Sequence, residues 1–142
     1  MYPRMSVASF VLLLSACSAP VPPSAGTAEK PPAAASASVV KPAQAYVDAV
    51  NAGDLDALVT SFAPEAEIVD VSRSIRGHDA IRAWADAEVI GGALRVVSIV
   101  ENRPDGQRLL VHWAPADSDG WRAHYDFTVG DYRILKADLQ YA

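Results

Sequence analysis

The stretch Tyr46–Val71, YVDAVNAGDLDALVTSFAPEAEIVDV, predicts two helices followed by a strand. Apolar side chains recur at spacings of three and four residues from Pro42 onward, as they do on the buried face of a helix. Asp54 can cap a second helix, which we expect to end before Pro64. Residues 66–71, AEIVDV, then have the composition of a short strand.

The chain after this stretch predicts a third helix and then a sheet. The segment 75–89, IRGHDAIRAWADAEV, has apolar residues at helical spacing, and after Gly91 and Gly92 the apolar period changes to two. The expected strands are Leu94–Asn102, Gln107–Ala114, Trp121–Val129 and Tyr132–Tyr141. This order predicts an α+β fold, in which three helices pack on one face of a curved, mainly antiparallel sheet. The mouth of such a cone is the expected ligand site.

The first 41 residues predict an export signal and a tether. Arg4 precedes an apolar run, 5–16, that is too short for a membrane span and typical of a secretory signal. Residues 14–17, LSAC, resemble the bacterial lipobox, which is cut before a cysteine that becomes acylated. The alternative is an ordinary signal peptide followed by an incidental Cys17. The expected organisation is a signal peptide (1–16), lipidated Cys17 with a disordered tether rich in Pro, Ala and Ser (17–41), and one domain (42–142).

These features predict a bacterial protein that is anchored by lipid in the cell envelope. Ser18 resembles the usual signal for outer-membrane sorting, so in a Gram-negative cell the domain would face the periplasm. A net charge of −5 without a basic stripe argues against nucleic acid as a partner. The single cysteine excludes an internal disulfide. No spacing of His, Cys or carboxylates suggests a metal site and no glycine loop suggests a phosphate site, so we expect no cofactor.

The order of the expected elements resembles the nuclear transport factor 2 (NTF2)-like superfamily, which includes SnoaL-like cyclases and ketosteroid isomerases. Residues 46–70 are very similar to the start of Δ5-3-ketosteroid isomerase, and residues 75–84, IRGHDAIRAW, resemble the G-x-x-A-I-R third helix of the superfamily. The resemblance extends over residues 42–142. It implies an NTF2-like cone with a pocket for a small apolar ligand, and a homodimer through the outer face of the sheet, as is common in relatives.

The resemblance also implies functional residues. Tyr46 stands where the isomerase has an oxyanion-binding tyrosine, and Asp70 stands where it has the general base. One hypothesis is therefore an isomerase or cyclase in which Asp70 takes a proton next to a carbonyl group. The alternative is that Asp70 caps a strand end in solvent and Tyr46 packs in the core, in a non-catalytic binding or assembly domain of the cell envelope.

Strand alternation selects the third residue of this set. The second oxyanion donor of the isomerase begins a D-x-F-x-F pattern, whose two apolar positions match Phe127 and Val129. This alignment puts Tyr125 at the donor position and Asp126 on the outer face of the sheet. A tyrosine hydroxyl can donate a hydrogen bond in the same way as the acid of the isomerase.

A second pair and a set of aromatic residues complete the predictions. Cyclase relatives use a His and an Asp on neighbouring strands, so His112 and Asp126 form a rival dyad, although their parity favours solvent or a dimer contact. His78 is expected at a helix start. The residues expected to line the pocket, with plain core packing as the alternative, are Trp84, Phe62, Phe127 and Trp113.

Overall fold

The computed structural model describes residues 38–142, so the predictions for the signal peptide, Cys17 and most of the tether lie outside the described residues. The helices are α2 (Lys41–Ala52), α3 (Leu55–Thr60) and α4 (Gly77–Glu88). The strands are β1 (Phe62–Asp70), β2 (Arg73–Arg76), β3 (Ala93–Arg103), β4 (Gly106–Ala114), β5 (Trp121–Gly130) and β6 (Arg133–Tyr141). Within this part of the chain, no helix is both long and apolar enough to cross a membrane.

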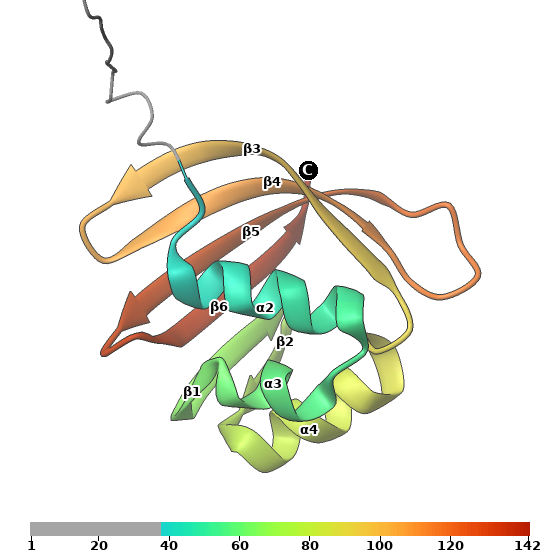
Figure 1. Cartoon of the computed structure of the whole chain (residues 1–142), viewed down its shortest axis with the longest axis horizontal. Helices are drawn as coiled ribbons and strands as arrows, with labels where there is room; N and C mark the ends of the chain where they lie inside the picture. The colour runs from blue at the N-terminus through green and yellow to red at the C-terminus, as the bar shows by residue number, and fades with distance from the viewer. Residues whose placement is uncertain (1–37) are drawn as a thin grey trace, which may run out of the picture. The chain divides into compact units, whose positions relative to one another are not determined.

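The strands form one curved sheet that wraps around the helices (Figure 1). Its order is β2-β1-β6-β5-β4-β3, and every neighbouring pair is antiparallel except β1 and β6. Helix α2 reaches across to β3, while α4 packs on β1 and β2. The predicted α+β cone, with three helices on one face of a mainly antiparallel sheet, is confirmed.

The predicted start of the first helix near Pro42 and the predicted cap of the second helix at Asp54 are confirmed. Pro42 lies in the first turn of α2, and Gly53 ends this helix in the left-handed conformation, with a φ of 69°. The backbone N–H of Ala57 donates a 3.0 Å hydrogen bond to the side chain of Asp54, which therefore caps α3.

The position of Phe62 corrects the prediction. We expected the second helix to continue until just before Pro64, but α3 ends at Thr60 and Phe62 begins β1, where it pairs with Ile134 of β6. The ladder between β1 and β6 is irregular after Phe62 and regular again from Glu67. This irregularity accommodates Pro64, which has no N–H to donate to a regular ladder.

Strand β2 was not predicted from the sequence. Residues 73–76 were expected to be loop and the start of the third helix, but they pair with the end of β1, with Asp70 opposite Arg73. Three of the four residues of β2 are exposed, so the strand lacks the alternation of apolar and polar residues that marks a half-buried strand. The two-residue turn between β1 and β2 has Val71 at a φ of 61°.

The four C-terminal strands match their predicted bounds to within one residue at each end. The turn between β5 and β6 consists of Asp131 and Tyr132, which both have positive φ, as a two-residue hairpin requires. The predicted parity of β5 is also confirmed, because Ala123, Tyr125 and Phe127 are buried between sheet and helices.

An aromatic cluster forms the centre of the core. The ring of Tyr46 on α2 lies 5.7 Å from the rings of both Phe62 and Phe127, and 6.4 Å from the ring of Tyr125. These centroid distances are typical of attractive edge-to-face and tilted contacts. The cluster joins α2 to both the parallel and the antiparallel part of the sheet.

Candidate functional site

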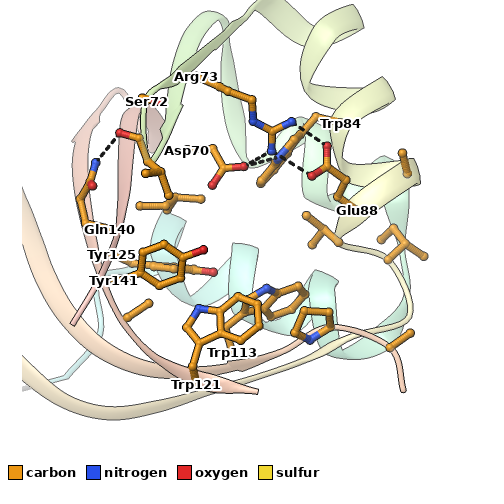
Figure 2. A pocket seen from close by; sticks show the side chains of 18 residues that line it. Asp70, Ser72, Arg73, Trp84, Glu88, Trp113, Trp121, Tyr125, Gln140 and Tyr141 are labelled. Atoms are coloured by element: carbon orange, nitrogen blue, oxygen red, sulfur yellow. Dashed lines mark hydrogen bonds and ion pairs between the residues drawn. The ribbon is translucent and has the colours of Figure 1, made fainter. Parts of the chain in front are cut away.

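A cavity of about 730 Å³ lies at the end of the sheet where β4 ends and β5 begins (Figure 2). Its walls come from the end of β1, the turn before β2, the C-terminal end of α4, the β4–β5 loop and the last residues of β6. A cleft of this volume suits a small organic ligand.

Asp70 lies at this cavity because it is the last residue of β1. The Nε1–H of Trp84 donates a hydrogen bond of 3.2 Å to Asp70 Oδ2, and the Nη2 group of Arg73 forms an ion pair with the same oxygen. Within residues 38–142, no hydrogen bond reaches the other oxygen, Oδ1. The carboxylate is therefore held in one orientation, and one of its oxygens has no partner in the described chain.

Arg73 also connects the β1–β2 turn to the end of α4. Its guanidinium donates hydrogen bonds of 3.0 Å and 2.9 Å to the two carboxylate oxygens of Glu88. These bonds hold the pKa of Glu88 below its usual range, and the hydrogen bonds to Glu88 and Asp70 raise the pKa of Arg73. Because both side chains are about half exposed, the pair contributes little to stability and chiefly fixes the shape of the cavity rim.

Tyr125 lines the cavity from β5, while Tyr46 lies behind it in the core. Both are buried, and within residues 38–142 neither hydroxyl has a hydrogen-bond partner. Burial raises the pKa of Tyr125, and the negative charge of Asp70 raises it further. The pKa of Tyr46 is raised by burial first, then by Tyr125 and by Asp70. The structure thus places Asp70 and Tyr125 on one cavity and Tyr46 in contact with Tyr125.

The burial of Tyr46 predicts a pH dependence of stability. Its folded-state pKa is raised above the ordinary value of about 10, so its contribution is complete below pH 10 and is lost as the pH rises. Between pH 10 and 11, we expect the free energy of unfolding of Tyr46→Phe to fall by about 1 kcal/mol less than that of the wild type, because the unfolded tyrosine ionises in this range and the buried one does not. Urea unfolding measures both slopes. The exposed Tyr132→Phe should follow the wild type, and parallel curves for Tyr46→Phe would refute the assignment.

The chain has three tryptophans, and all of them line the cavity. Trp84 comes from α4, Trp113 from the end of β4 and Trp121 from the start of β5, where it pairs with Trp113. Gly92 lies directly against Trp113, because a Cβ at this position would collide with the indole ring. Trp121 was not predicted as a site residue.

Phe62 and Phe127, which we expected to line the pocket, lie in the aromatic core instead. Both side chains are completely buried and neither contacts the cavity. Phe127 has the inward parity of Tyr125, but it lies two residues further along β5, away from the mouth and under α2. Parity therefore identified the face of the strand correctly but not the depth within the cone.

The rival dyad is not brought together. His112 pairs with Arg122 across β4 and β5, whereas Asp126 pairs with Arg108. Asp126 accepts a 2.6 Å hydrogen bond from Arg103 and a 3.1 Å hydrogen bond from Arg108, so its carboxylate is occupied on the outer face. This separation follows from the register, because His112 lies four residues from the position opposite Asp126.

The other candidate positions belong to the framework. His78 is in the first turn of α4, as expected, and its Nε2 lies 2.8 Å from the backbone oxygen of Phe62. Among residues 38–142, no three His, Cys, Asp or Glu side chains are grouped so that they could hold a metal ion.

Comparison with solved structures shows the same fold. RV0760c from Mycobacterium tuberculosis, in complex with estradiol-17beta-hemisuccinate, has a TM-score of 0.63 at 15% identity, covering 71% of this chain and 91% of that chain. Delta 5-3-ketosteroid isomerase from Mycobacterium sp. has a TM-score of 0.62 at 16% identity, covering 71% and 90%. A protein of ketosteroid isomerase-like fold from Catenulispora acidiphila, in complex with trimethylamine, has a TM-score of 0.62 at 16% identity, covering 74% and 88%.

The solved structures show only the fold, whereas a comparison of sequences identifies the family. No curated protein sequence matches the chain. A family model described as the SnoaL-like domain matches residues 43–133, which include α3, α4, nearly all of α2 and all strands of the sheet except most of β6. The chain therefore belongs to the SnoaL-like domain family, within the NTF2-like superfamily.

Proposed function

We propose that the cavity binds a small, largely apolar molecule and that Asp70 and Tyr125 act on it by acid–base chemistry. The observation that carries this proposal is that one aromatic-lined cavity holds both a fixed carboxylate and a buried tyrosine hydroxyl that has no hydrogen-bond partner among residues 38–142. The steroid-derived and amine ligands of the structural neighbours support a small organic ligand for this fold.

The reaction that suits this arrangement is the shift of a double bond in a β,γ-unsaturated ketone. Asp70 Oδ1 would take a proton from the carbon between the carbonyl group and the double bond. The electron pair would move to the carbonyl oxygen, and the Tyr125 hydroxyl would donate a hydrogen bond to the resulting enolate. Asp70 would return the proton to the far end of the double bond. Tyr46, in the core, would pack against the ring of Tyr125.

A non-catalytic binding domain is the second candidate, and the ion pair of Asp70 with Arg73 favours it. Asp70 already forms an ion pair with Arg73, so its carboxylate has a structural role at the cavity rim that requires no catalysis. In this role the cavity would bind its ligand without changing it, and the domain could serve binding or assembly at the cell envelope.

The three tryptophans provide the test, because their fluorescence reports on the cavity. Titrating the purified chain with a steroidal β,γ-unsaturated ketone should give saturable quenching, and the ultraviolet absorbance of the conjugated product should rise with time. Quenching without product would support the binding domain. No quenching by this or other apolar ligands would contradict both candidates.

We also propose that the chain is exported and anchored by lipid on Cys17 in the bacterial cell envelope. The lipobox-like sequence before Cys17 and the composition of residues 18–41 support this proposal. The mass of the mature chain tests it, because an anchored protein would begin at Cys17 and carry acyl chains. An uncleaved or unacylated chain would contradict it. A homodimer through the outer face of the sheet stays a prediction, which sedimentation of the purified chain can test.

A further inference from the structure

The charged residues at the cavity are mainly acidic. Among the described residues that line it, Asp70 and Glu88 are acids and Arg73 is the only base. The loop of residues 115–120 supplies part of the wall and adds two exposed acids but no base. Because Arg73 already donates hydrogen bonds to both lining carboxylates, an anionic ligand would meet a guanidinium that is occupied and a net negative rim.

The end of α4 increases this negative potential. Its last turn has two acids, Asp86 and Glu88, and no basic residue. Acids at a helix C-terminus oppose the helix dipole, which favours positive charge at that end. Of these two acids only Glu88 lines the cavity, and Val89 and Ile90 continue the wall beyond it, so the Glu88 carboxylate and the negative end of the helix dipole lie beside the cavity. A positive group bound there would relieve the repulsion that Arg73 relieves only in part.

Aromatic rings form the opposite wall (Figure 2). The rings of Trp121 and Tyr141 lie 5.9 Å apart at an angle of 48°, and 40% of Trp121 and 65% of Tyr141 remain exposed. Trp113 lies beside Trp121, and Tyr125 adds a buried hydroxyl that has no hydrogen-bond partner within residues 38–142. The faces of such rings attract organic cations.

We infer that the ligand of this cavity carries an ammonium group on an apolar body. The ammonium group would lie between the carboxylates of Asp70 and Glu88 and the rings of Trp113, Trp121 and Tyr141, and Tyr125 would be available to a polar group of the ligand. This inference rests on the proposed function, since it specifies the ligand class of the same cavity.

The test compares two probes of the same shape. Benzyltrimethylammonium carries a positive charge, and neopentylbenzene has a neutral carbon in place of the nitrogen. Titrations of the purified full chain, followed by tryptophan fluorescence, give the dissociation constant of each probe. At low ionic strength the cation should bind about threefold to tenfold more tightly than its isostere, and salt should reduce this preference.

Two variants should change the preference in opposite directions. Glu88→Gln removes a lining carboxylate and should bring the affinities of the two probes together. Arg73→Gln removes the competing cation and should increase the preference for benzyltrimethylammonium further. Asp131→Asn changes the net charge equally at the β5–β6 turn, the opposite end of β5 from Trp121, and should leave the preference unchanged.

The outcomes separate this inference from the proposed function. Equal or tighter binding of neopentylbenzene would overturn the ammonium inference and leave an apolar ligand site intact. Binding of the steroidal ketone but of neither probe would also overturn it. If neither the probes nor any apolar ligand quenched the tryptophans, the proposed function itself would fail.

Discussion

Replacing Asp70 with asparagine is expected to slow the isomerisation of a β,γ-unsaturated ketone by about 10²–10⁴-fold, the usual contribution of a positioned general base. Asparagine keeps the size of the side chain and an oxygen that can accept the hydrogen bond from Trp84. It cannot take a proton from carbon. Ligand affinity, measured by tryptophan quenching, should therefore change much less than the turnover rate.

The matched control for this variant is Asp126→Asn. Asp126 lies on the outer face with Arg103 and Arg108, away from the cavity, so its replacement should leave the rate unchanged. Equal rates for wild type and Asp70→Asn would exclude Asp70 as the base. A large loss in Asp126→Asn alone would restore the dyad of His112 and Asp126 that the register separates.

Phe127→Ala is expected to lower the free energy of unfolding by about 3–5 kcal/mol. The side chain is completely buried, and its ring lies 5.7 Å from that of Tyr46 and 6.2 Å from that of Tyr125. Truncation would remove these contacts and leave a cavity where α2 packs on the sheet. Urea unfolding at neutral pH measures the change.

The exposed Tyr132 provides the control for this loss. Its side chain is 93% exposed in the β5–β6 turn, so Tyr132→Ala should change the free energy of unfolding by less than about 0.5 kcal/mol. A loss of under about 1 kcal/mol in Phe127→Ala would show that the aromatic cluster does not form the core.

The regular elements could be predicted because each has a strong local signal. Strand β5 alternates strictly between apolar and polar residues, so its bounds and the inward direction of Tyr125 followed from period and parity. Strand β2 has four residues with one partly buried side chain, and its existence depends on pairing with β1. Pairing partners are not visible in a short exposed segment.

The site could be predicted only in part, for two physical reasons. Ion pairs such as Arg73 with Glu88 join residues 15 apart, and they form only because the β1–β2 turn brings Arg73 against the end of α4. Strand parity also predicts only the face of the sheet on which a side chain lies, and not how deep in the cone it lies. Phe127 and Tyr125 share one face of β5, but only Tyr125 reaches the cavity.

Obstruction of the cavity mouth tests the central claim, that this cavity is the ligand site, most directly. Ala87 is an exposed cavity-lining residue of α4, and Ala83, one turn earlier, is exposed but does not line the cavity. We expect Ala87→Phe to weaken tryptophan quenching by an apolar ligand at least about tenfold, because a phenyl ring there would occupy space the ligand needs. Ala83→Phe should bind like the wild type. Unchanged affinity in Ala87→Phe would contradict the assignment of the cavity as the ligand site.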